Sequence, residues 1–121
     1  MAPKPKAEVL CVEDHPACVR LVQEALREFA DVRGIGSVQR ALTELESCTP
    51  TLLLLDLDLP DGDGLQVLDA MRRDSRLRAV PVLVISATAD EAVFSEARQR
   101  GAQACLAKPI DLAQVRRLAQ T

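Results

Sequence analysis

Short, uninterrupted apolar runs alternate along the chain with segments in which apolar residues recur every three or four positions. Uninterrupted runs are typical of strands that are buried on both faces of a parallel sheet. The segments between them have the spacing of helices that bury one face. We expect five strands, within residues 9–12, 32–35, 51–55, 80–85 and 104–107.

A helix is predicted after each of these strands, and several of the helices carry recognisable start and stop signals. Pro16 suits the first turn of the first helix. Ser37 and Asp90 can cap the second and fourth helices, and Gly101 is placed to end the fourth. The apolar residues at helical spacing are, helix by helix, Cys18, Val22, Ala25 and Phe29; Val38, Ala41, Leu42 and Leu45; Leu65, Leu68 and Met71; Val93, Phe94 and Ala97; and Leu112, Val115 and Leu118.

This alternation predicts an α/β fold, a doubly wound parallel sheet with helices on both faces. The spacing leaves no room for hairpins, so each strand should lead to the next through a helix. The chain has 121 residues, of which 48 % are hydrophobic, and this is enough apolar material for one core. We assign residues 1–7 to an N-terminal tail and residues 8–121 to a single domain.

Composition and charge argue against several classes of function. The net charge of −3 gives no long-range attraction to phosphate backbones, so we expect no direct nucleic-acid binding. The longest uncharged apolar run, residues 79–85, is too short to span a bilayer, and we expect neither a signal peptide nor a membrane partner. The four cysteines form no C-x-x-C pair, which favours reduced thiols in a cytoplasmic protein.

Polar residues follow four of the predicted strands at their carboxyl ends. Glu13 and Asp14 come after the first strand and Asp56 after the third. Ser86 follows the fourth strand and Lys108 the fifth. Because the carboxyl ends of parallel strands meet at one edge of the sheet, we expect these three acids, one hydroxyl and one ammonium to converge there.

Such a group of side chains suits metal-assisted phosphoryl chemistry. Three neighbouring carboxylates repel one another, and a hard divalent cation such as Mg²⁺ relieves that repulsion. A carboxylate such as that of Asp56 can attack phosphorus and form an aspartyl phosphate. Lys108 would then supply positive charge, and Ser86 a hydroxyl donor, to the phosphoryl oxygens.

The same motifs, in this order and spacing, closely resemble the receiver domain of two-component response regulators, the CheY-like superfamily, over about residues 8–118. The resemblance implies a flavodoxin-like (βα)5 fold with strand order 2-1-3-4-5. The motifs that carry the resemblance are the pair Glu13-Asp14, the D-x-x-x-P-x-x-x-G pattern from Asp56 through Pro60 to Gly64, Ser86-Ala87 and Lys108-Pro109.

What the resemblance implies about function is specific. Asp56 would be phosphorylated by a histidine kinase or a histidine phosphotransfer protein. Mg²⁺ would be held by Glu13, Asp14, Asp56 and the backbone carbonyl of Asp58, and the Lys108-Pro109 peptide bond is often cis in the family. The chain would catalyse only its own aspartyl phosphorylation and dephosphorylation. A downstream effector protein, or an output domain that this sequence lacks, would read the phosphorylated state.

Cys105 departs from the family pattern at the position three residues before Lys108, where many receivers carry Tyr or Phe. Without an aromatic ring, the usual inward swing of that side chain cannot operate. We therefore expect activation to propagate through the loop after Ser86 and through the fourth helix. Asp58 and Thr88 correspond to positions that tune phosphoryl lifetime in the family, although they also fit ordinary solvent-facing loop residues.

Three further polar residues near the motifs receive local roles. We expect Asp61 and Asp63 to serve the turn rather than the metal. His15 should occupy the start of the first helix, at the rim of the metal site and without a catalytic role.

Two other functions compete with the phosphorylated switch. The Asp56-Leu57-Asp58 triplet superficially resembles the D-x-D motif of haloacid-dehalogenase phosphatases, but it stands on the third strand rather than near the N-terminus. A degenerate receiver that acts only as a docking module is the second alternative. The complete set of acids, hydroxyl and lysine argues against it.

Overall fold

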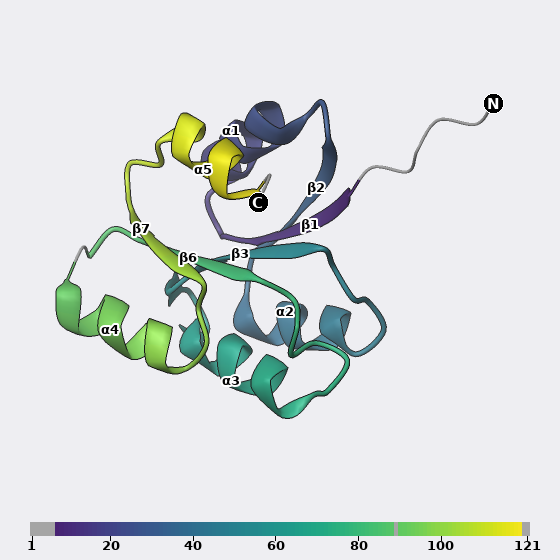
Figure 1. Ribbon diagram of the computed structural model, residues 1–121, viewed down its shortest axis with the longest axis vertical. Coiled ribbons are helices and arrows are strands. Elements are labelled where there is room, and N and C mark those ends of the chain that lie inside the picture. The colour runs from purple at the N-terminus through teal and green to yellow at the C-terminus, as the bar shows by residue number, and fades with distance from the viewer. Residues whose placement is uncertain (1–6, 89, 120–121) are drawn as a thin grey trace.

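The protein, seen in a computed structural model that describes residues 7–88 and 90–119, is built around a five-stranded parallel sheet (Figure 1). The strands lie in the order β2-β1-β3-β6-β7, which is the predicted order 2-1-3-4-5. Their bounds are β1 Ala7–Val12, β2 Ala30–Ile35, β3 Leu52–Asp56, β6 Val82–Ser86 and β7 Ala104–Ala107. The flavodoxin-like fold is therefore confirmed.

Helices cover both faces of the sheet (Figure 1). α1 and α5 lie side by side on one face, and α2, α3 and α4 lie on the other. Their bounds are α1 Pro16–Leu26, α2 Val38–Leu45, α3 Leu65–Arg73, α4 Glu91–Gln99 and α5 Leu112–Ala119. Among the described residues, no helix has the length and apolar character that crossing a bilayer requires.

β3 lies in the middle of the sheet and contributes to the core on both of its faces. All five of its residues are buried, and they pair in register with β1 on one side and β6 on the other. Leu53 and Leu55 pack into the apolar cluster under α2 and α3, whereas Leu52 and Leu54 pack into the cluster under α1 and α5. This two-sided burial explains why the strand is an uninterrupted apolar run that ends in a carboxylate.

The helix signals read from the sequence act as expected. Pro16 is the first residue of α1. The Ser37 hydroxyl accepts a hydrogen bond from the backbone N–H of Arg40, and the Asp90 carboxylate accepts one from Ala92. Gly101 follows α4 with a φ of 114°, a left-handed conformation that favours glycine.

Several element boundaries differ from the predictions. α1 ends at Leu26, so Phe29 lies beyond the helix, and β2 begins two residues earlier than expected. β6 begins only at Val82, because Pro81 has no N–H to donate to a ladder. Ala7 already belongs to β1, and the rest of the predicted tail, residues 1–6, lies outside the described residues.

The expectation that the spacing leaves no room for hairpins is wrong at one place. β4 (Asp58–Leu59) and β5 (Gly62–Asp63) form a two-stranded antiparallel hairpin directly after β3. Each strand has only two residues, too few to leave an alternating pattern in the sequence. Gly62, with a φ of 156°, supplies the backbone conformation that the turn requires.

A glycine, Gly34, stands within β2 for a packing reason. A Cβ atom at this position would lie 2.8 Å from Cγ1 of Val19 on α1, closer than carbon atoms approach. The missing side chain therefore lets α1 lie directly against the sheet, next to the loop that carries the first acidic pair.

Candidate functional site

The structure brings Glu13, Asp56 and Lys108 together at the carboxyl edge of the sheet. Glu13 directly follows β1, Asp56 is the last residue of β3, and Lys108 directly follows β7. The Nζ atom of Lys108 lies 3.0 Å from Oδ2 of Asp56 and 2.8 Å from Oε2 of Glu13. One ammonium group thus pairs with two carboxylates. The Lys108-Pro109 peptide bond is cis, as the family resemblance implies.

Burial makes this ion-pair group electrostatically strong. Glu13 and Asp56 are only 2 % and 1 % exposed. Burial raises the pKa of Asp56, and the neighbouring Glu13 carboxylate raises it further, against hydrogen bonds from Asp58 and Lys108. Burial also works to raise the pKa of Glu13, but hydrogen bonds from Lys108 and His15 outweigh it and lower the pKa. The two carboxylates raise the pKa of Lys108 although burial opposes this, so its ammonium stays charged.

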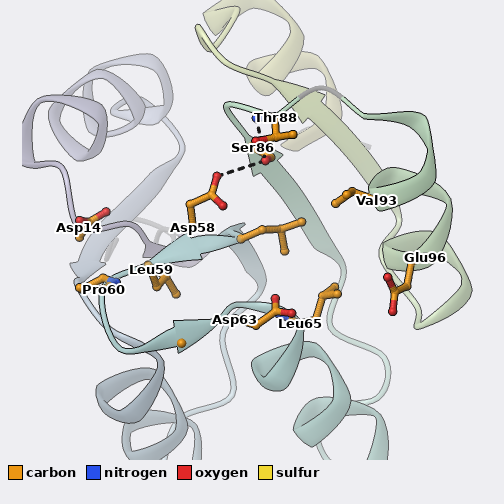
Figure 2. A pocket seen from close by; sticks show the side chains of 12 residues that line it. Asp14, Asp58, Leu59, Pro60, Asp63, Leu65, Ser86, Thr88, Val93 and Glu96 are labelled. Carbon is orange, nitrogen blue, oxygen red and sulfur yellow. Dashed lines mark hydrogen bonds between the residues drawn. The ribbon is translucent and has the colours of Figure 1, made fainter.

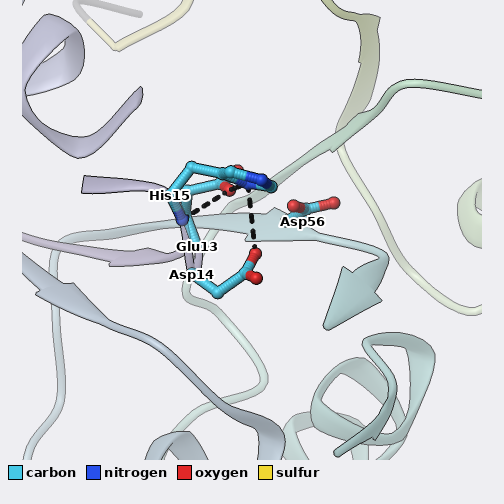
Figure 3. A group of neighbouring side chains, drawn as sticks. All are labelled: Glu13, Asp14, His15 and Asp56. Carbon is cyan, nitrogen blue, oxygen red and sulfur yellow. Dashed lines mark hydrogen bonds and ion pairs between the residues drawn. The ribbon is translucent and has the colours of Figure 1, made fainter. Parts of the chain in front are cut away.

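Asp14 and His15 complete a cluster of metal-binding atoms around this centre (Figure 3). One ligand atom from each of Glu13, Asp14, His15 and Asp56 lies within 4.8 Å of the others. Nδ1 of His15 is 2.8 Å from Oε1 of Glu13 and 3.3 Å from Oδ1 of Asp14. His15 is the N-cap residue of α1, as expected, and its ring reaches back over both acids. Adjacency in the sequence places His15 next to the acidic pair, but the direction of its ring is seen only in the structure.

The donor set of this cluster fits a divalent cation. Carboxylate oxygens are the ligands that Mg²⁺ prefers in proteins. Three carboxylates lie in this cluster, and the ammonium of Lys108 pairs with only two of them, Glu13 and Asp56. The residues present are therefore compatible with a metal ion.

Asp58, Ser86 and Thr88 lie on the other side of Asp56, along a groove of about 610 Å³ (Figure 2). The backbone N–H of Asp58 donates to Oδ1 of Asp56 at 2.9 Å. The Ser86 hydroxyl is buried, reaches Oδ2 of Asp58 only at 3.4 Å, and accepts a hydrogen bond from the backbone N–H of Thr88. Val93 of α4 lines the same groove. This space is lined by Asp58, whose N–H contacts Asp56, and its volume has room for a phosphoryl group.

Asp61 and Asp63 both bond to helix N-termini, and Asp61 does more than the turn role predicted for it. Its two carboxylate oxygens accept the backbone N–H groups of Val38 at 2.7 Å and Gln39 at 2.9 Å, at the start of α2. These hydrogen bonds lower the pKa of Asp61. The Asp63 carboxylate accepts the N–H of Leu65, at the start of α3. Asp61 thereby ties the loop after Asp56 to α2.

Gly64 is required by close packing against the end of β3. A Cβ atom on Gly64 would meet the backbone carbonyl oxygen of Asp56. The N–H of Gly64 donates to the carbonyl oxygen of Leu57 at 3.2 Å. The final glycine of the D-x-x-x-P-x-x-x-G pattern thus lets the loop fold back tightly against the end of β3.

Cys105 lies in β7 and packs against α4. Its Sγ atom is 3.6 Å from the backbone carbonyl oxygen of Phe94, and its side chain joins the apolar cluster on that face of the sheet. Burial raises the pKa of the thiol. The position three residues before Lys108 is therefore filled by a small side chain that contacts the fourth helix.

The fold and the site define a receiver domain, and comparison with known proteins agrees. The family model of the response regulator receiver domain matches residues 9–120, so the chain belongs to this family. The KDP operon transcriptional regulatory protein KdpE of Escherichia coli (strain K12) is 38 % identical over 108 residues, which cover 88 % of this chain and 47 % of KdpE. The chain therefore spans about half the length of this curated relative.

Two solved structures show the same fold. The phosphorylated cyanobacterial phytochrome response regulator RcpA is 28 % identical, with a TM-score of 0.83 over 96 % of this chain and 90 % of that one. The Mn²⁺-bound form of response regulator Rcp1 is also 28 % identical, with a TM-score of 0.80 over 94 % of this chain and 89 % of that one.

Proposed function

We propose that Asp56 is the phosphoacceptor of a two-component phosphorelay and that its phosphorylation requires Mg²⁺. The observation that carries this proposal is the position of the Asp56 carboxylate, which is buried at the edge of the sheet, 3.0 Å from the Lys108 ammonium and within the cluster of metal-binding atoms. Phosphorylated RcpA and Mn²⁺-bound Rcp1, both similar in fold and sequence, support it.

The reaction is a transfer between two side chains. A carboxylate oxygen of Asp56 forms a bond to phosphorus while the phosphorus–nitrogen bond of a phosphohistidine breaks, and the departing imidazole keeps the electron pair and takes up a proton. Glu13, Asp14, Asp56 and the backbone carbonyl of Asp58 are the proposed Mg²⁺ ligands. The ion, when bound, neutralises charge on the phosphoryl oxygens.

The remaining site residues position the phosphoryl group. The Asp58 N–H fixes one carboxylate oxygen of Asp56, and Lys108 lies at the other, where it can follow the negative charge onto the phosphoryl group. Ser86 offers a hydroxyl donor from the next strand. The Asp58 and Thr88 side chains border the groove through which water would reach the phosphoryl group, so we assign them to the tuning of its lifetime.

The partners follow from this role. We assign phosphorylation to a histidine kinase or a histidine phosphotransfer protein, in the cytoplasm. Readout is assigned to an effector protein or output domain that contacts the surface formed by α4, β7 and α5. The chain would turn over no external substrate. The family match does not favour the haloacid-dehalogenase alternative, and the pairing of Lys108 with Asp56 argues against a degenerate docking module.

Labelling with a small acyl phosphate tests the proposal. Incubation with acetyl phosphate and Mg²⁺ should add the mass of one phosphoryl group to the wild-type chain. The gain should be absent in Asp56→Asn and after chelation of Mg²⁺, and should fall sharply in Lys108→Ala. Asp63→Asn is the matched control, because this exposed acid lies in the same loop but outside the metal-binding cluster. Undiminished labelling of Asp56→Asn would contradict the proposal.

A further inference from the structure

His15 places a nitrogen atom within a cluster whose other ligand atoms are carboxylate oxygens (Figure 3). Its Nδ1 atom lies 2.8 Å from Glu13 and 3.3 Å from Asp14, and its side chain is 65 % exposed. No side-chain hydrogen bond caps α1 from this residue. The ring is therefore directed toward the acids rather than toward the helix N-terminus, and it can adjust without disturbing the core.

The Glu13 carboxylate connects the His15 ring to the buried centre of the site. Its Oε2 atom is buried and pairs with the Lys108 ammonium at 2.8 Å. Oε1 of the same carboxylate accepts hydrogen bonds from both the backbone N–H and the ring of His15. The imidazole nitrogen thus lies within 4.8 Å of a carboxylate oxygen from each of Glu13, Asp14 and Asp56.

The kind of donor atom decides which metal ion a site prefers. Carboxylate, carbonyl and water oxygens suit Mg²⁺, Ca²⁺ and Mn²⁺, whereas imidazole nitrogen suits ions such as Ni²⁺, Cu²⁺ and Zn²⁺. Nδ1 of His15 donates a hydrogen bond to Oε1 of Glu13 and therefore carries a proton. A metal ion bound at Nδ1 would displace that proton and leave the neutral ring with its proton on Nε2. Adding one such nitrogen to an oxygen site raises its affinity for nitrogen-preferring ions more than its affinity for Mg²⁺.

We propose that His15 is an additional metal ligand at the phosphorylation site and makes it selective for divalent transition-metal ions over Mg²⁺. The inference rests on the proposed function, because it places the nitrogen at the ion that would assist phosphorylation of Asp56. The ligand set would be Nδ1 of His15 with carboxylate oxygens of Glu13, Asp14 and Asp56.

Titration calorimetry with Ni²⁺ and with Mg²⁺, on the wild-type chain and on His15→Gln, tests the selectivity. The variant should bind Ni²⁺ at least about tenfold more weakly, a loss in the range seen when groups that support a metal site are removed. Its Mg²⁺ affinity should change by less than about twofold, since Mg²⁺ prefers oxygen ligands; this also shows that the variant is folded. Cys18→Ser is the matched control, because this thiol lies on the first turns of α1 and could itself bind Ni²⁺.

A spectroscopic measurement identifies the nitrogen directly. The chain contains a single histidine, so an imidazole signal can arise only from His15. Electron spin echo modulation of Mn²⁺ bound to the wild-type chain should show a directly coordinated ¹⁴N nucleus, and His15→Gln should lose that signal. Equal weakening of Ni²⁺ and Mg²⁺ binding in His15→Gln, or an unchanged Ni²⁺ affinity, would overturn the inference.

The two proposals fail in different ways. If Asp56 is labelled normally with Mg²⁺, but His15→Gln leaves the ratio of the Ni²⁺ and Mg²⁺ affinities unchanged, only the role of His15 is overturned. If the wild-type chain shows nitrogen coordination but accepts no phosphoryl group with any of these ions, the role of His15 is supported and the phosphoacceptor role of Asp56 is overturned.

Discussion

The two sides of Asp56 differ in how firmly their residues are held. On the β1 side, Glu13 pairs with both Lys108 and His15, with distances of 2.8 Å in each case. On the β6 side, Ser86 reaches Asp58 only at 3.4 Å, Thr88 is exposed, and both residues line a groove of about 610 Å³ together with Val93 of α4. The charged residues on the β1 side are paired with one another, whereas Ser86 and Thr88 on the β6 side line an open groove.

This difference assigns separate tasks to the two sides. Moving charged groups on the β1 side would break buried ion pairs, which is costly. The Ser86 hydroxyl makes only a long hydrogen bond to Asp58 and accepts one from the Thr88 N–H, so reorienting these two side chains would break no ion pair. The β1 side is therefore suited to fixing the metal and the phosphoacceptor, and the β6 side to changing shape once a phosphoryl group arrives.

The largest expected effect on stability comes from removing the Lys108 ammonium group, which pairs with both Glu13 and Asp56. Lys108→Ala leaves the buried carboxylates of Glu13 and Asp56 without their partner, and removing one member of such a buried pair costs about 3–5 kcal/mol in unfolding free energy. Urea denaturation of the metal-free protein at neutral pH measures it. Adding Asp56→Asn should restore part of the loss, because one of the two unpaired charges disappears.

Arg100→Ala is the surface control for this experiment. Arg100 pairs with Asp69 and Glu96 in half-exposed positions, where ion pairs contribute about 0–1 kcal/mol. A Lys108→Ala cost no larger than that of Arg100→Ala would mean that the β1 side is not the rigid one.

The next largest effect on stability is expected at Gly64, at the end of the loop that follows β3. Gly64→Ala forces a methyl group onto the backbone carbonyl oxygen of Asp56, and overpacking of this kind costs about 1–3 kcal/mol. Gly36→Ala is the matched control, because the nearest atom to its Cβ, the Cα of Asp14, lies at an ordinary 3.8 Å. Thermal or urea unfolding compares the two variants, and equal stabilities would contradict the close packing seen here.

A smaller and pH-dependent effect is expected at Asp61. Hydrogen bonds from Gln39 and Val38 lower its pKa in the folded protein, so its stabilisation is fully present above the unfolded-state pKa of 3.8 and is lost as the pH falls through the folded-state pKa. Asp61→Asn should therefore be less stable than wild type at pH 7, and the difference should disappear in acid. Urea unfolding as a function of pH measures it.

Ser37→Ala provides the comparison for Asp61. It removes the hydroxyl cap from the same end of α2, but the hydroxyl does not titrate in this range, so its cost should not vary with pH. A pH-independent cost in both variants would show that the charge of Asp61 plays no part.

The smallest effect on stability, and the sharpest test of the contrast between the two sides, concerns the shape change itself. Phosphorylation should shift the backbone amide NMR signals of residues 86–88 and of α4 more than those of α1, because Ser86 and Thr88 line the groove beside Val93 of α4 and the charges on the β1 side are held by ion pairs. Cys105 contacts α4 through the Phe94 carbonyl and offers no ring to swing inward. Unchanged α4 signals after phosphorylation would contradict this route.

The sequence predicted the parts of the molecule that depend on local pattern and on parallel topology. Apolar runs located the strands, and their common direction placed Glu13, Asp56, Ser86 and Lys108 at one edge. Contacts that depend on how loops fold left no such pattern. Asp61 and its partners on α2 are 22 and 23 residues apart in the chain, and nothing in either segment indicates the other.

The unpredicted features share a physical cause. The hairpin of β4 and β5 is too short to produce a periodic pattern. The sequence therefore predicts the turn but not the pairing of the two strands. The approach of the His15 ring to Glu13 depends on a rotamer, which neighbouring residues in the chain do not determine. Side-chain direction and loop closure are thus the features that required three-dimensional coordinates.

The hydrogen bonds from α2 to Asp61 have a thermodynamic consequence for whatever binds this domain. They join the second helix to the segment that carries Asp58 and contacts the end of β3. Coupling between two binding events acts equally in both directions. Suppose that a partner binds α2 with higher affinity in one arrangement of this segment. Binding of the partner would then change phosphate retention by a certain factor, and the phosphate would change the affinity of the partner by the same factor.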